Sequence, residues 1–183
     1  GMLPLAKGLL LPLRKRGDLA RVPRDGRHVF AADLIANAGL ADPPVIAPES
    51  DLAALQYTGG TTGISKGAML THANLTANVE QILQILPDAR PGRESVLSVL
   101  PLFHVFGMTV AMNLAVRLAA EMILLPRFEA DAAARIIARQ RPTLFPGVPT
   151  IYAAISGAVE KRPTDLTSVR YCISGGAPLP AEV

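Results

Sequence analysis

A cluster of small, hydroxylated and cationic residues between positions 57 and 67 is the part of the chain best suited to chemistry. It reads Tyr-Thr-Gly-Gly-Thr-Thr-Gly-Ile-Ser-Lys-Gly. Glycines let backbone N–H groups turn toward an anion, the hydroxyls add neutral donors, and the lysine adds a mobile cation. The composition predicts a loop that wraps around a polyphosphate. The residues predicted to contact the phosphates are Thr58, Gly59, Gly60, Thr61, Thr62, Gly63, Ser65, Lys66 and Gly67.

Two common phosphate-binding patterns do not match this cluster. Walker A requires a lysine between a glycine and a Ser or Thr, whereas Lys66 follows Ser65 and precedes Gly67. The pattern Gly-x-Gly-x-x-Gly does not fit the glycine spacing at any register. A surface loop without a ligand is the plainer alternative, because clusters of Gly, Ser and Thr often mark no more than that.

The order Thr-Gly-Gly-Thr-Thr-Gly-x-x-Lys-Gly resembles the phosphate-binding motif of the adenylate-forming (AMP-binding) superfamily. This family includes acyl-CoA synthetases, firefly-luciferase-like proteins and peptide-synthetase adenylation domains. It usually has Ser where this chain has Gly59, and Pro where it has Ser65. The flanking residues 51–57 and 68–75 are most similar to bacterial long-chain fatty acyl-CoA ligases. The resemblance covers residues 51–183 well and the preceding residues only loosely.

This resemblance implies that the parent enzyme uses ATP and Mg²⁺ to turn a long-chain fatty acid into an acyl-adenylate, and then transfers the acyl group to coenzyme A. Lys66 and Thr61 would be catalytic, stabilising charge on the β- and γ-phosphates as the carboxylate attacks the α-phosphorus. A fatty acyl-AMP ligase, a short-chain or aryl-CoA ligase and an amino-acid adenylating domain are alternatives. So are a non-catalytic nucleotide- or lipid-binding module and a structural piece that self-associates.

Three further segments resemble the family. Residues 100–107 (Leu-Pro-Leu-Phe-His-Val-Phe-Gly) and 145–150 (Phe-Pro-Gly-Val-Pro-Thr) correspond to borders of its acyl pocket, and residues 174–179 (Ser-Gly-Gly-Ala-Pro-Leu) to a stretch along the adenine and ribose. By sequence alone a tight turn is equally natural for 174–179, and 145–150 can also be a rigid strand-to-helix turn. A histidine among apolar residues is more often structural. The implied substrate-pocket residues are Phe103, His104, Gly107, Met108, Val148, Pro149 and Thr150, and the implied nucleotide contacts are Gly175, Gly176, Ala177 and Pro178.

Alternating strands and helices must position these residues. Apolar patterning and proline positions predict strands at 52–57, 96–100, 122–125, 143–145 and 169–174, with helices beginning at 71, 106, 130 and 149. This order predicts an α/β fold with a mostly parallel sheet flanked by helices, which the resemblance makes part of an acyl-CoA synthetase-like large domain. Ligands bind beyond the carboxyl ends of such strands, so the glycine loop and the turns at 104, 148 and 175 are expected on one edge.

Composition and charge bound the remaining possibilities. Half of the 183 residues are apolar and 18% are charged, which argues against disorder. We expect a basic, proline-rich leader at 1–50 and the βα core of an AMP-binding domain at 51–183, cut from a longer chain, with no metal ligands of its own and inactive alone. Nucleic acid is a poor candidate partner, because the leader lacks aromatic residues for stacking.

Residues 1–30 carry seven Lys or Arg against two Asp. A stretch such as 7–27 could therefore contact anionic lipid on the inner membrane surface, although an ordinary solvated segment is the preferred interpretation. The stretch 95–116 lacks charged residues and is long enough to cross a bilayer. Pro and Gly interrupt it, so a buried strand followed by a buried helix is predicted instead.

The single cysteine, Cys172, excludes an internal disulfide and any cysteine-based zinc cluster. It suits a reducing cytoplasm, where we place the protein. Because Cys172 falls within the apolar run 169–173, we expect a buried structural thiol.

Overall fold

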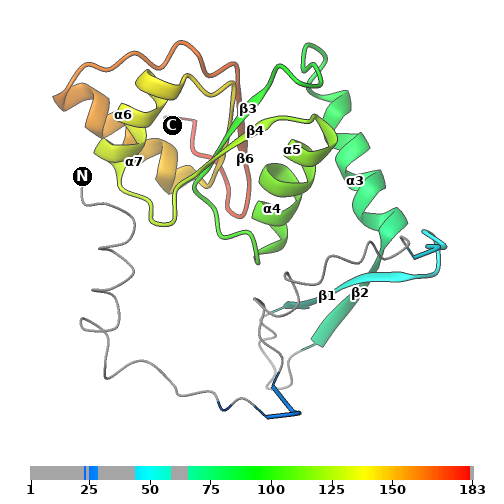
Figure 1. The fold of residues 1–183 in the computed structure, drawn as a ribbon. Helices are drawn as coiled ribbons and strands as arrows, with labels where there is room; N and C mark the ends of the chain where they lie inside the picture. The colour runs from blue at the N-terminus through cyan, green and yellow to red at the C-terminus, as the bar shows by residue number, and fades with distance from the viewer. Residues whose placement is uncertain (1–22, 24, 29–43, 59–65, 182–183) are drawn as a thin grey trace. The chain divides into compact units, whose positions relative to one another are not determined.

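Four parallel strands form the main sheet of the part of the chain that the computed structural model describes, which comprises residues 23, 25–28, 44–58 and 66–181. The chain divides into two units, Gly1–Val45 and Ile46–Val183, and the elements below belong to the second. They are β1 (Leu52–Thr58), β2 (Lys66–Thr71), α3 (His72–Gln84), β3 (Ser95–Ser98), α4 (Val105–Gly107), the π-helix η1 (Met108–Asn113), α5 (Leu114–Arg117), β4 (Glu121–Leu124), α6 (Ala130–Gln140), β5 (Leu144–Gly147), α7 (Pro149–Lys161) and β6 (Tyr171–Ser174) (Figure 1).

The main sheet has the strand order β4-β3-β5-β6, and every pairing in it is parallel. The segments that connect β3 to β4, β4 to β5 and β5 to β6 all contain helices. Helices cover both faces, α6 and α7 on one side and α3 to α5 on the other (Figure 1). This confirms the predicted α/β fold with a parallel sheet flanked by helices.

Alternation along the strands explains why both faces are buried. Val96 and Leu144 point into a core with α3, η1 and α5, whereas Leu97 and Phe145 point into a second core with α6 and α7. Val96, Leu97 and Leu144 have no exposed surface, and Phe145 is 3% exposed. Burying each such side chain contributes roughly 1.5–3 kcal/mol. The continuous apolar strands that sequence patterning identified are therefore central strands of a two-sided sheet.

The first strand does not belong to this sheet, which corrects one prediction. β1 pairs antiparallel with β2, from Thr58 opposite Lys66 to Leu52 opposite Thr71, in a separate two-stranded sheet. The predicted strand–loop–helix arrangement is thus strand–loop–strand–helix. β2 was missed because most of it is exposed and lacks the alternation that marks a half-buried strand. Cross-strand pairing, which no local pattern reveals, decides its conformation.

Helix α3 begins where the sequence predicts. The Thr71 hydroxyl accepts a hydrogen bond from the Asn74 amide at 3.2 Å, and the Asn74 side chain accepts one from the Thr71 amide at 3.0 Å. This reciprocal capping satisfies two backbone donors at the helix start. Val79 of this helix and Leu86 just after it are buried in the first core. The helix ends at Gln84, before Pro87 could disrupt it.

The segment predicted as a helix beginning at 106 is helical from Val105 to Arg117, but its middle is the π-helix η1. Gly107 permits the tight entry, because a Cβ there would overlap the carbonyl oxygen of Pro101. The buried side chains Leu114 and Leu118 pack into the first core. Among the described residues, no helix combines the length and the apolarity needed to span a bilayer.

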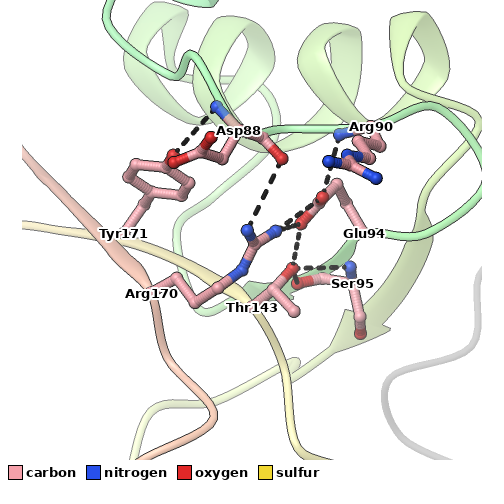
Figure 2. A network of polar contacts seen from close by, with 7 residues as sticks. All are labelled: Asp88, Arg90, Glu94, Ser95, Thr143, Arg170 and Tyr171. Carbon is pink, nitrogen blue, oxygen red and sulfur yellow. Dashed lines mark hydrogen bonds and ion pairs between the residues drawn. The ribbon is translucent and has the colours of Figure 1, made fainter.

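A polar network joins the amino-terminal ends of three sheet strands (Figure 2). Glu94 precedes β3, Thr143 precedes β5 and Arg170 precedes β6. The Glu94 carboxylate accepts hydrogen bonds from the Thr143 hydroxyl at 2.6 Å, from the Arg170 guanidinium at 2.6 Å and from the Arg90 amide at 2.9 Å. Thr143 in turn accepts from the Ser95 amide at 3.0 Å. The network therefore links β3, β5 and β6 to one another at their amino-terminal ends.

Candidate functional site

Three loops meet at the carboxyl ends of β3, β5 and β6. A Cβ at Gly175 would lie 2.8 Å from the Phe106 ring, so this ring rests directly on the glycine backbone. A Cβ at Gly176 would lie 3.5 Å from Cγ1 of Val148. The Gly175 amide also donates a hydrogen bond to the Gly147 carbonyl at 3.3 Å. The turn at 175 thus contacts both the turn at 104 and the turn at 148.

His104 acts as the cap of the first turn of α4. Its Nδ1 accepts a hydrogen bond from the Phe106 amide at 3.2 Å. An accepting Nδ1 carries no proton, which leaves the proton of a neutral imidazole on Nε2. The side chain is exposed. The structural and ligand-binding interpretations are therefore compatible, since one ring nitrogen holds the loop while the other can donate outward.

The other predicted pocket residues differ in exposure. Phe103 is 84% exposed, Met108 and Val148 are half-buried, and Thr150 is exposed. Pro149 is buried at the first position of α7. A proline fits there because a backbone N–H at this position would have no acceptor within the helix. A large exposed aromatic side chain beside this loop cluster provides apolar surface at the site rather than in the core.

The segment after β6 is shaped by its glycines. Gly176 has a φ of +79°, a backbone conformation that side-chain-bearing residues rarely adopt. Ala177 and Pro178 follow it at the surface. The Ser174 hydroxyl is buried and has no hydrogen-bond partner among the described residues. A buried hydroxyl without a partner is uncommon, and here it lies directly before the glycine turn.

The glycine loop is described at its two ends. Residues 59–65, including Gly59, Gly60, Thr61, Thr62, Gly63 and Ser65, lie outside the described residues. Lys66 and Gly67 begin β2 rather than ending a loop, and a Cβ at Gly67 would lie 3.3 Å from the ring of its cross-strand partner Tyr57. Because β1 is not a strand of the parallel sheet, the premise that this loop follows a strand of that sheet is wrong, and the placement of the loop itself stays a prediction.

Tyr152 is a residue of the site region that the sequence did not indicate. Its hydroxyl lies 2.8 Å from the Phe145 carbonyl oxygen and 3.0 Å from that of Ile173. Its ring packs edge-on against Phe145, with centroids 5.5 Å apart and planes at 79°. A tyrosine in the first turns of an amphipathic helix resembles any core residue in sequence. Its role depends on the pairing of β5 with β6, which is a tertiary property.

Cys172 is exposed, which corrects the prediction of a buried thiol. It lies on β6, which is an edge strand of the described sheet and is paired on one side only, with β5. The residue borders an apolar hollow of about 350 Å³ whose lining includes Ile155, Val169 and Leu179. Partial burial there raises the pKa of the Cys172 thiol. An apolar run in the sequence could not distinguish a central strand from an edge strand.

No group of three or more His, Cys, Asp or Glu side chains able to hold a metal ion occurs within residues 23, 25–28, 44–58 and 66–181. None of the described carboxylates is therefore assigned to magnesium.

Comparison with known proteins agrees with this geometry. A family model described as "AMP-binding enzyme" matches residues 11–183. A long-chain-fatty-acid–CoA ligase of Bacillus subtilis (strain 168) is 44% identical over 185 residues, covering 99% of this chain and 33% of that protein. The chain therefore spans a third of the length of this relative.

Two solved structures have the same fold. The inhibitor-bound N-terminal domain of FACL13 from Mycobacterium tuberculosis superposes with a TM-score of 0.72 at 29% identity, over 82% of this chain and 37% of that one. ATP-bound MatB from Rhodopseudomonas palustris superposes with a TM-score of 0.69 at 34% identity, over 82% of this chain and 29% of that one.

Proposed function

This chain belongs to the AMP-binding enzyme family, and on that premise we propose that it forms part of an ATP-dependent ligase that joins a long-chain fatty acid to coenzyme A. The fatty acid carboxylate would attack the α-phosphorus of ATP, pyrophosphate would leave, and the acyl group would pass from AMP to the thiol of coenzyme A. The relative with 44% identity is named for this substrate class. Magnesium would accompany ATP as its counter-ion.

Lys66 and the loop before it are the proposed phosphate contacts. Pairing of Lys66 with Thr58 joins both ends of the loop in one antiparallel ladder. A loop closed in this way can present successive backbone N–H groups and hydroxyls to a single anion. Lys66 and Thr61 would stabilise the charge that builds up on the β- and γ-phosphates in the transition state.

The three contacting turns are the proposed sites for the rest of the substrates. His104 would donate from Nε2, while Phe103, Met108 and Val148 would offer apolar contacts to the acyl chain, beside Gly107, Pro149 and Thr150. The residues from Gly175 to Ala177 carry no bulky side chain of their own, so a flat adenine ring could approach their backbone on the side that Phe106 does not cover. The observation that carries the proposal is the packing of Phe106 on Gly175, because it joins the proposed acyl and nucleotide contacts.

We also propose that the basic stretch at 7–27 can bring the protein to anionic lipid, where long-chain fatty acids reside. Its support is the charge of the sequence alone. Co-sedimentation with vesicles of phosphatidylglycerol, and with neutral phosphatidylcholine vesicles as the control, measures this contact. Equal binding to both would contradict it.

ATP–pyrophosphate exchange with a panel of acids tests the proposed reaction in the full-length protein in which this chain occurs. We expect exchange that depends on long-chain fatty acids and falls by about 10²–10³-fold in Lys66→Ala. Lys161→Ala, at the exposed end of α7, is the matched control and should retain full activity. Exchange driven by an aryl or amino acid instead would replace the proposed substrate class, and unchanged activity in Lys66→Ala would remove the assigned role.

A further inference from the structure

We propose that Tyr152 is a positioning residue that holds the turn at 148–150 and the turn at 174–176 in fixed relation to each other. This inference rests on the proposed function, because these turns are the ones assigned to the acyl chain and the nucleotide. Tyr152 itself is not assigned to contact either substrate. It would act through the backbone of β5 and β6.

The Tyr152 hydroxyl reaches both strands from the helix that follows one of them. Phe145 and Ile173 lie on the neighbouring strands β5 and β6, one residue apart in register, since Phe145 is paired with Cys172 and Pro146 with Ile173. Their carbonyl oxygens lie 2.8 Å and 3.0 Å from the hydroxyl oxygen. The single hydroxyl proton can bond either carbonyl, so it links α7, β5 and β6 at one point.

The ring of Tyr152 fixes the same region by packing. A Cβ at Gly147 would lie 3.2 Å from Cζ of the ring and 3.3 Å from its hydroxyl oxygen, so the glycine lets the ring approach closely. Gly147 is also the residue whose carbonyl accepts from the Gly175 amide. Tyr152 therefore contacts the backbone immediately before Val148 and, through Ile173, the backbone immediately before the glycine turn.

The hydroxyl is suited to a permanent structural bond. It is partly buried among apolar groups, and this burial raises the pKa of Tyr152 well above its ordinary value. The group consequently keeps its proton at any physiological pH. A proton that is always present suits a residue that positions other groups and does not suit one that exchanges protons with a substrate.

Two tyrosine-to-phenylalanine variants of this chain form a matched test. Tyr152→Phe removes the hydroxyl and keeps the ring against Phe145. Tyr171→Phe removes a hydroxyl at the other end of β6, where it accepts from the Asp88 amide at 3.3 Å. Native-state hydrogen exchange is measured at the Gly175 amide near the site and at the Tyr171 amide, which donates to the Thr143 carbonyl, at the opposite end.

We expect Tyr152→Phe to accelerate exchange at Gly175 by about tenfold and to leave Tyr171 within about twofold, with the reverse pattern in Tyr171→Phe. The dissociation constant of ATP, measured by calorimetry, should rise about five- to tenfold in Tyr152→Phe alone. Both variants are also prepared with Gly157→Ala, a substitution on the open side of α7, so that a stability loss does not prevent measurement.

Unchanged exchange at Gly175, or equal acceleration at both ends, would overturn the proposal, because the hydroxyl would then have no local role. Accelerated exchange with an unchanged ATP affinity would overturn it as well. If the unsubstituted chain bound no ATP, the proposed nucleotide site would fail in this chain, and the exchange pattern would still decide whether Tyr152 orders the two turns.

Discussion

The carboxylate of Glu94 and the guanidinium of Arg170 lie 2.6 Å apart although they are 76 positions apart in the sequence. The pair is asymmetric, because the Glu94 side chain is 1% exposed and that of Arg170 is 41% exposed. The pair, drawn in Figure 2, lies just before β3 and β6, whereas the candidate turns follow the carboxyl ends of these strands. The cost of removing each partner should therefore differ.

We predict that Arg170→Met lowers the free energy of unfolding by about 2–3 kcal/mol, since it leaves a buried carboxylate without a countercharge. Glu94→Gln should cost only about 1–2 kcal/mol, because water can solvate the remaining guanidinium and the amide can still accept a hydrogen bond. Urea unfolding measures both. Arg117→Met, which breaks the half-exposed pair with Glu80, is the control and should cost about 0–1 kcal/mol. A larger loss in Glu94→Gln than in Arg170→Met would contradict this account.

Glu94 should also make stability depend on acid. Burial by itself raises the pKa of Glu94, but hydrogen bonds from Arg170, Thr143 and the Arg90 amide outweigh it and hold the pKa below its ordinary value. The unfolded chain then binds the proton first, so the stabilisation is complete above the ordinary pKa and is lost as the pH falls through the folded pKa. Urea midpoints between about pH 7 and pH 3 should fall less steeply in Glu94→Gln than in the parent chain. Glu160→Gln, on the exposed side of α7, should leave the slope unchanged.

Two glycine-to-alanine substitutions should have opposite signs. Gly175→Ala places a Cβ against the Phe106 ring and should cost about 1–3 kcal/mol by overpacking. Gly157→Ala meets nothing within 4 Å in the interior of α7 and should add about 0.5–1 kcal/mol by restricting the unfolded chain. Thermal unfolding distinguishes them. Adding Phe106→Leu to Gly175→Ala should recover part of the loss, and strictly additive effects would show that the two residues do not touch.

Cys172 should react with iodoacetamide in the folded chain, because it is exposed on the edge strand β6. Since the raised pKa of Cys172 disfavours the thiolate, the reaction should be slower at neutral pH than that of a small-molecule thiol, and should accelerate as the pH rises. Mass spectrometry gives the rate. Modification only after addition of urea would indicate a buried thiol and contradict the exposed position.

Most of the parallel sheet could be predicted from local pattern. The helices predicted to begin at 130 and 149 begin there, and the strands of the parallel sheet differ from prediction by at most two residues at their ends. Continuous apolar strands separated by amphipathic helices leave few alternatives to a two-sided parallel sheet. The turns at 104, 148 and 175 could be placed together for the same reason, since all three follow strands of that sheet.

The chain's sequence by itself determined the family motif, the alternation of strands and helices, and the small residues that let Phe106 and Tyr152 approach a backbone, because these depend on residue type and short spacing. Tertiary structure alone decided that residues 66–71 pair with β1, that Cys172 lies on an edge, that Glu94 meets Arg170, and that one tyrosine hydroxyl reaches two strands. Each of these depends on which distant segments become neighbours. Which segments become neighbours depends on how much apolar surface the whole core buries, and no short stretch of sequence contains that information.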